Sequence, residues 1–208
     1  MDPMVASMLQ SRSFDFVVLQ DHTQAPARRE SRRETILSLQ QDYAPDLTKN
    51  RKKPPIVILL QTYAYKNPHM RGSQDLGGLD SFTDLLAEGY REYQACLCEE
   101  LGVGIDEVRI APMGEAVRYI YYKHAELFPK LYSWDEFHPS PYGTYLQACV
   151  LLLTIARSTG TVLPTYDPTW WNMCRYLQPP NEDPLPRPSS EEAAVLAGVA
   201  ESVCRQGI

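Results

Sequence analysis

The chain has 208 residues, of which 44% are hydrophobic, 22% charged and 10% aromatic. This composition is typical of a folded globular protein with a sizeable core, and it excludes a disordered chain, a collagen-like repeat and a small disulfide scaffold. The formal net charge is −6, which gives no general electrostatic attraction to nucleic acid, so we expect no nucleic-acid partner.

The sequence carries no signal for membrane insertion. Its longest apolar run, Ala148 to Ala156, is too short to cross a bilayer, and its first residues lack the charged-then-apolar pattern of a signal peptide. The 5 cysteines form an odd number without zinc-like spacing, which favours free thiols. The chain as given is therefore interpreted as cytoplasmic, with the compartment left open because a signal peptide would be lost with a missing N-terminus.

Three apolar segments predict strands of a parallel sheet, since parallel strands are covered on both faces. They are Phe14–Gln20, Ile56–Leu60 and Val108–Ala111. Between the first two, Ser31 and Glu34 match a capping box, so we expect a helix that begins there and ends at Pro45.

Further apolar residues recur at helical spacing, with cap residues before them. The predicted helices run from Asp80 or Ser81 to Leu101, from about Val117, from Ser140 to Ile155, and from Ser189 to about Cys204. Alternating strands and helices predict an α/β three-layer sandwich with a parallel sheet. We assign residues 1–162 to this domain, and residues 163–208 to a Pro-rich segment and a C-terminal helix that pack on it.

The sharpest chemical signal is a short loop before the predicted helix at Ser140. Asp135 lies three residues ahead of His138, and Pro139 follows. At this spacing the carboxylate reaches the imidazole within one loop, fixes its tautomer and stabilises its protonated form, so the other ring nitrogen is free to act as a general base.

This loop and the helix after it resemble the last conserved block of the SGNH (GDSL-type) hydrolases. The matching positions are Asp135, His138, Pro139, Ser140 and Gly143, and then Tyr145, Leu146, Ala148, Cys149 and Val150. Residues 16–26 resemble an SGNH subgroup whose third block reads V-V-L-Q-E-Q-S-Q-x-P. Glu88-Gly89-Tyr90 and Ala111-Pro112-Met113-Gly114 also resemble that subgroup, so the likeness runs from about Phe14 to Thr154.

The resemblance implies a flavodoxin-like SGNH fold whose first strands are missing from this chain. It implies that Asp135 orients and charge-balances His138, and that His138 is the general base and later the acid. The third block supplies an oxyanion-hole side chain at the position of His22, usually Asn and in this subgroup Gln. A ring nitrogen of His22 can still donate, and Gln20 is a second polar candidate at the same strand end.

The nucleophile of the family is a serine in a Gly-Asp-Ser or Gly-Asn-Ser turn, and this sequence contains neither turn. Three explanations for this absence stay open. The chain is a truncated form of a parent esterase, or it is a short product that binds without cleaving, or another serine such as Ser73 or Ser133 has taken over the role. Losing the first strand would also expose an apolar edge along Phe14–Gln20, which predicts aggregation unless something covers it.

The expected function is ester hydrolysis of the acyl or acetyl esterase lineage, with the chain inactive as given and with no metal or organic cofactor. The expected substrate is a small-molecule or carbohydrate ester, and the oligomeric state stays open. A metal site drawn from Asp135 and the histidines at 69, 124 and 138 lacks zinc-like spacing. The rival interpretation is a non-catalytic carbohydrate- or ligand-binding pseudoenzyme, because Trp170, Trp171 and many tyrosines offer stacking faces.

Overall fold

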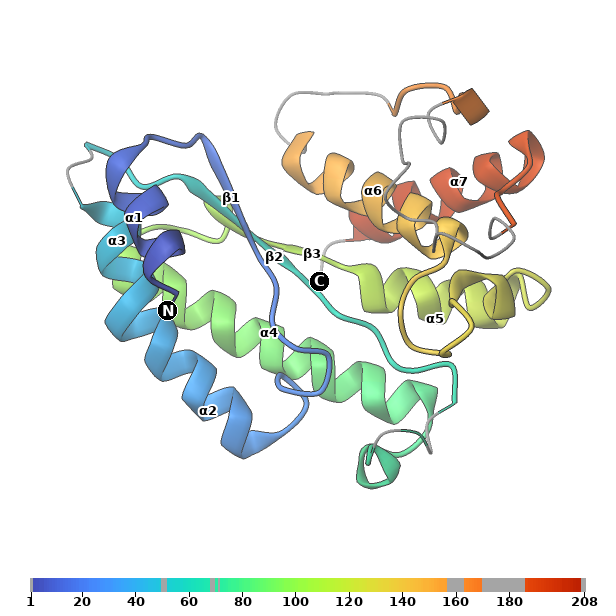
Figure 1. Ribbon diagram of the computed structural model, residues 1–208, viewed down its shortest axis with the longest axis horizontal. Helices are drawn as coiled ribbons and strands as arrows, with labels where there is room; N and C mark the ends of the chain where they lie inside the picture. The colour runs from blue at the N-terminus through green and yellow to red at the C-terminus, as the bar shows by residue number, and fades with distance from the viewer. Residues whose placement is uncertain are drawn as a thin grey trace. The chain divides into compact units, whose positions relative to one another are not determined.

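The computed structural model describes residues 2–49, 52–67, 70, 72–156, 163–169 and 186–206. The chain divides into two compact units (Figure 1). The first contains residues 1–64 and 68–114, and the second contains residues 65–67 and 115–207. Each unit is described by itself below.

The first unit is built on a parallel sheet of three strands in the order β1-β2-β3. Phe16–Leu19 forms β1, Ile56–Leu60 forms β2 and Val108–Ala111 forms β3. Phe16 pairs with Ile56, and Val57 pairs with Val108. All three predicted strands are confirmed, and the α/β class with a parallel sheet is confirmed with them.

The strands differ in burial. Four consecutive residues of β2 are buried, as the continuous apolar run predicts for a central strand. In β1 exposed residues alternate with half-buried ones, because this strand lies at one edge of the sheet with β2 as its partner among the described strands.

One face of the sheet is covered by helices of the same unit: α1 (Pro3–Ser11), α2 (Arg29–Ser38), α3 (Ala44–Thr48) and α4 (Leu79–Leu101). Leu59 and Val57 share a core cluster with Tyr90, Tyr93 and Leu97 of α4. Each fully buried side chain of this size contributes about 1.5–3 kcal/mol. Gly89 lets α4 lie close to the backbone of Pro26, since a Cβ at this position would lie 2.1 Å from the Pro26 carbonyl oxygen.

The region between β1 and β2 differs from the prediction at both ends of its helix. The helix α2 begins at Arg29, and Ser31 is not its cap, because the Ser31 hydroxyl donates instead to the carbonyl oxygens of Ala25 and Arg28. Pro45 does not end the helical stretch. A π-helical turn, η1 (Leu39–Tyr43), leads into α3. Pro45 lies in the first turn of α3, where a backbone N–H would have no partner within the helix, so its absence costs nothing.

The second unit contains α5 (Met113–Lys123, which begins at the end of the first unit), the short 3₁₀ turn η3 (Phe128–Leu131), α6 (Pro141–Ile155) and α7 (Ser190–Gln206). The predicted start of α6 is confirmed: the Ser140 hydroxyl accepts from the backbone N–H groups of Tyr142 and Gly143. The Ala/Val-rich face of α7 packs against α6, where Ala193, Leu196 and Ala200 are fully buried. Another 3₁₀ turn, η2 (Gln74–Leu76), belongs to the first unit.

Candidate functional site

A tightly closed loop between η3 and α6 holds the predicted base and its carboxylate. Tyr132 and Pro139 form an antiparallel bridge across the loop. Inside it, the Ser133 N–H donates to the His138 carbonyl at 2.8 Å, and the Glu136 N–H donates to the Ser133 carbonyl at 3.0 Å. These backbone bonds fix the course of the main chain between Tyr132 and Pro139.

Asp135 and His138 meet directly in this loop. The Nδ1 atom of His138 lies 2.6 Å from Oδ2 of Asp135. The other carboxylate oxygen accepts from two backbone N–H groups, that of His138 at 3.0 Å and that of Phe137 at 3.2 Å. The Asp135 side chain is 10% exposed, whereas the His138 side chain is 64% exposed. The carboxylate is therefore held in place while the imidazole faces solvent.

The surroundings of Asp135 keep it ionised. Burial works against the charged form, but the backbone N–H and the ring of His138, together with the Phe137 N–H, outweigh it and lower the pKa of Asp135. An ionised carboxylate on Nδ1 favours the tautomer that carries its proton there. The exposed Nε2 is then left with a lone pair that can accept a proton.

Neighbouring side chains support the imidazole from one side. The ring of Phe137 lies 3.7 Å from that of His138, centroid to centroid, and Tyr65 meets Phe137 edge to face at 5.8 Å. Glu136, which lies between Asp135 and Phe137 in the sequence, has a φ of 62°. Its Oε1 atom lies 3.5 Å from Nζ of Lys66. A left-handed backbone is uncommon for a residue other than glycine, and such conformations cluster at functional sites.

Gln20 and His22, the other two predicted site residues, lie just beyond β1 in the first unit, and both are exposed. The backbone N–H of His22 donates to the Asp21 carboxylate at 2.7 Å, and its carbonyl accepts from Ala25. These bonds order the turn after β1 and leave the ring of His22 and the amide of Gln20 on the surface. An oxyanion role for either residue stays a prediction.

The sequence reasoning missed Asp21, which organises the end of β1. One of its carboxylate oxygens accepts from the hydroxyls of Thr35 at 2.7 Å and Tyr93 at 2.8 Å. Burial raises the pKa of Tyr90, which lies beside Tyr93, to about 12. The signal was available, because a carboxylate directly after an apolar strand needs donors, but the donors come from α2 and α4 and could not be identified from spacing.

A cavity of about 190 Å³ opens at this end of β1. Its wall combines the end of β1 with η1 and α4; the residues that line it are Leu19, Gln20, Asp21, Thr35, Ser38, Leu39, Tyr43, Leu59, Tyr90 and Tyr93. The π-helical turn η1 therefore forms part of a hollow surface, as such turns often do near functional sites.

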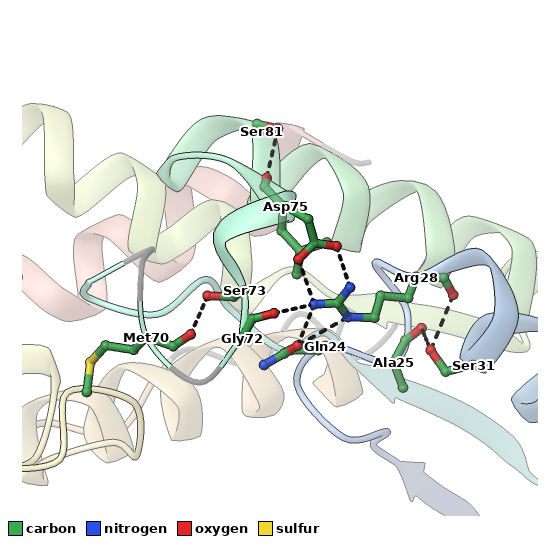
Figure 2. A network of polar contacts seen from close by, with 10 residues as sticks. Gln24, Ala25, Arg28, Ser31, Met70, Gly72, Ser73, Asp75 and Ser81 are labelled. Carbon is green, nitrogen blue, oxygen red and sulfur yellow. Dashed lines mark hydrogen bonds and ion pairs between the residues drawn. The ribbon is translucent and has the colours of Figure 1, made fainter.

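The long loop after β2 is tied to the start of α2 (Figure 2). Arg28 contacts both carboxylate oxygens of Asp75, and its guanidinium also donates to Gln24 and to the carbonyl of Gly72. In the same loop Ser73 is fully buried, and its hydroxyl donates to the Met70 carbonyl at 2.7 Å. Ser73 is thus used in a turn and is poorly placed to replace a missing nucleophile.

Among the described residues, no group of three or more His, Cys, Asp or Glu side chains is arranged to hold a metal ion. No helix in that part of the chain has the length and apolar character needed to span a membrane. His69, Trp170 and Trp171 lie outside the described residues.

Comparison with known proteins supports the fold. No family model matches the sequence, and no curated protein matches it. A DUF4886 family protein from Bacteroides uniformis ATCC 8492 superimposes with a TM-score of 0.64 at 15% identity, covering 97% of this chain and 65% of that one. A protein from Slackia heliotrinireducens described as a putative SGNH hydrolase gives a TM-score of 0.52 at 21% identity, covering 73% and 71%.

The fold is therefore SGNH-like, of the flavodoxin type, and α/β with a parallel sheet. The chain spans 65% of the length of the DUF4886 protein. At this level of identity the likeness concerns the fold, and the chemistry has to be argued from the residues of the chain itself.

Proposed function

We propose that this chain carries the general-base half of a Ser-His-Asp ester hydrolase of the acyl or acetyl esterase type. The observation that carries the proposal is the 2.6 Å contact between Oδ2 of Asp135 and Nδ1 of His138, in which the carboxylate is largely shielded and the imidazole is exposed. The SGNH-like fold and the hydrolase description of one structural neighbour support it.

In this reaction Nε2 of His138 takes the proton of a serine hydroxyl while that oxygen attacks the ester carbonyl. The protonated imidazole, stabilised by Asp135, then gives the proton to the departing alcohol. A water molecule activated by the same nitrogen hydrolyses the acyl-enzyme and restores the serine. The steps require no metal and no organic cofactor.

The serine has to come from a block that this sequence does not contain, since neither Gly-Asp-Ser nor Gly-Asn-Ser occurs in it. A unit of nucleophile, base and orienting carboxylate loses nearly all its rate enhancement when one member is removed. The chain by itself is therefore proposed to be inactive toward esters, and its substrates in the complete assembly to be small-molecule or carbohydrate esters.

A fluorophosphonate probe, which labels activated serines, tests the proposal. The chain as given should remain unlabelled. A version preceded by an SGNH-type strand with a Gly-Asp-Ser turn should be labelled, and His138→Ala should slow that labelling by about 10²-fold or more. Labelling of the chain as given would show that another serine has taken over, and labelling unaffected by His138→Ala would contradict the role of His138.

The second candidate function is carbohydrate binding without cleavage, and the exposed aromatic side chains of the second unit favour it. Trp134 is 79% exposed, Tyr122 58% and Tyr121 42%. Such side chains combine a face for stacking with a polar group for hydrogen bonding. Binding on a glycan array without release of acyl groups would favour this function, whereas acetate release from acetylated sugars by the serine-bearing version would favour the esterase.

A further inference from the structure

The segment directly after β2 contacts the loop of the candidate site. The backbone N–H of Lys66 donates to the Glu136 carbonyl at 3.1 Å, and Nζ of Lys66 lies 3.5 Å from Oε1 of Glu136. The buried ring of Tyr65 meets the ring of Phe137 edge to face. These residues all belong to the second unit, so a segment far away in the sequence supports the loop from outside.

One peptide group connects this segment to Asp135. The carbonyl of Glu136 and the N–H of Phe137 belong to the same planar unit. Its carbonyl accepts from Lys66, while its N–H donates to Oδ1 of Asp135 at 3.2 Å. A planar unit cannot turn at one end without turning at the other. The bond from Lys66 therefore fixes the direction of a donor that holds the Asp135 carboxylate.

The loop needs this support because Glu136 has a left-handed backbone, with a φ of 62°. Such a conformation is unfavourable for a residue that carries a Cβ, and it persists where surrounding contacts determine it. One contact lies inside the loop, where the Glu136 N–H donates to the Ser133 carbonyl at 3.0 Å. Lys66 adds a hydrogen bond and a charge pairing from another part of the chain.

We propose that Lys66 is a positioning residue for Asp135 and His138, and that its backbone N–H acts through the peptide group between Glu136 and Phe137. With this bond in place the carboxylate stays directed at Nδ1 of His138. The proton of the neutral imidazole then stays on Nδ1, which leaves Nε2 as the base. The catalytic part of this inference rests on the proposed function, whereas the physical coupling between Lys66 and Asp135 does not.

Amide hydrogen exchange in the chain as given tests the coupling without any substitution. The N–H of Lys66 and the N–H of Phe137 are both held by bonds of the same peptide group. One local opening of this group releases both, so we expect their protection factors to agree within about tenfold. A difference of more than about tenfold would show that the two bonds open independently, and it would overturn the proposal.

Lys66→Pro removes the donor, since proline has no backbone N–H. The protection of the Phe137 amide should fall at least about tenfold. Long-range proton–nitrogen NMR at about pH 9, where histidine side chains are normally neutral, should show the His138 proton moving from Nδ1 alone to a mixture of both ring nitrogens. Lys66→Ala is the matched variant: it removes the ammonium but retains the N–H, so its effect on the Phe137 protection should be at least about threefold smaller.

A support that is only structural would change the melting temperature and leave the ring proton in place. A folded Lys66→Pro variant that keeps the His138 proton on Nδ1 would therefore overturn the proposal. If Lys66→Pro lacks a cooperative melt, the exchange comparison in the unsubstituted chain decides by itself.

Fluorophosphonate labelling of the serine-bearing version separates this inference from the proposed function. Lys66→Pro should slow the labelling at least about tenfold, because a misdirected base loses much of its effect. Labelling that depends on His138 but proceeds at the full rate in Lys66→Pro would overturn the role of Lys66 and leave the proposed function standing. Absence of labelling, together with matched protection of the Lys66 and Phe137 amides, would contradict the esterase and support the coupling.

Discussion

At the scale of single residues, Asp135 and His138 differ in exposure. The carboxylate is 10% exposed and receives donors from its own loop, whereas the imidazole is 64% exposed and lies tilted against the ring of Phe137. This difference suits the proposed roles, because a base that meets a substrate needs the accessible position and a residue that orients it needs the fixed one. The sequence spacing was enough to predict the contact between them.

Asp135→Asn tests how the carboxylate supports the loop. The asparagine retains an oxygen for the backbone donors but loses the charge beside His138, so we expect the free energy of unfolding at pH 7 to fall by about 1 kcal/mol. Because the folded pKa of Asp135 lies below its unfolded value, this contribution is present above about pH 4 and is lost as the pH falls through the folded pKa.

Urea unfolding from pH 7 to pH 3 measures this contribution. The difference in unfolding free energy between the parent chain and the Asn variant should be present at pH 5 and should shrink below about pH 4, as the carboxylate of the parent chain is protonated. A difference that grows between pH 4 and pH 3 would contradict the assigned direction.

At the scale of elements, a capping box joins α7 to α6 and η3. The backbone N–H of Ser189 donates to the Glu192 carboxylate at 2.8 Å, and the Glu192 N–H donates to the Ser189 hydroxyl at 3.2 Å. The same carboxylate lies 2.7 Å from Nζ of Lys130 and accepts from the Tyr142 hydroxyl at 2.9 Å. The Lys130 ammonium and these donors together lower the pKa of Glu192 to about 2.

Glu192→Gln should therefore lower the free energy of unfolding at pH 7 by about 1–2 kcal/mol, allowing for partial solvent screening. The lowered pKa means that the contribution exists above about pH 4.5 and disappears as the pH falls toward 2. Thermal melts at pH 7 and near pH 2 check this: the two proteins should differ at pH 7 and converge at the lower pH. Glu126→Gln, at an exposed position of the same unit, is the control and should leave the free energy of unfolding unchanged at both pH values.

The first turn of α6 depends on a close backbone approach. A Cβ at Gly143 would lie 2.3 Å from the carbonyl oxygen of Leu131, so Gly143→Ala should destabilise the chain by about 2–3 kcal/mol. Gly198 on α7 has nothing within 4 Å of its Cβ position, and Gly198→Ala should be neutral or should stabilise by up to about 1 kcal/mol. Equal effects of the two substitutions in chemical denaturation would refute the steric explanation.

The elements that could be predicted are those specified by their own residues. The strands β1, β2 and β3 and the Ser140 cap follow from local apolar runs and a hydroxyl before Pro141. The beginning of α2 could not be predicted, because the Ser31 hydroxyl has a choice of acceptors and bonds to Ala25 and Arg28. The turn η1 carries no distinctive pattern, since a π-helical turn differs from an α-helical one only in which carbonyl each N–H selects.

At the scale of the whole molecule, the sequence predicted the class of fold and the dyad but not the division into two compact units. Residues 65–67, which follow β2 directly, belong to the second unit, where Tyr65 contacts Phe137 and Lys66 contacts Glu136. Contacts between segments so far apart in the sequence depend on tertiary packing, and no local pattern records them. The Asp21 cluster, which joins β1, α2 and α4, was missed for the same reason.

We propose His138, oriented by Asp135, as the base of an ester hydrolase. The most direct measurement is kcat/KM for acetyl-ester hydrolysis by the chain preceded by a Gly-Asp-Ser block, with and without His138→Ala. We predict a loss of about 10³-fold or more for His138→Ala and less than about twofold for His124→Ala, the matched histidine outside the site. Hydrolysis that survives His138→Ala undiminished, or that falls equally with His124→Ala, would contradict the account.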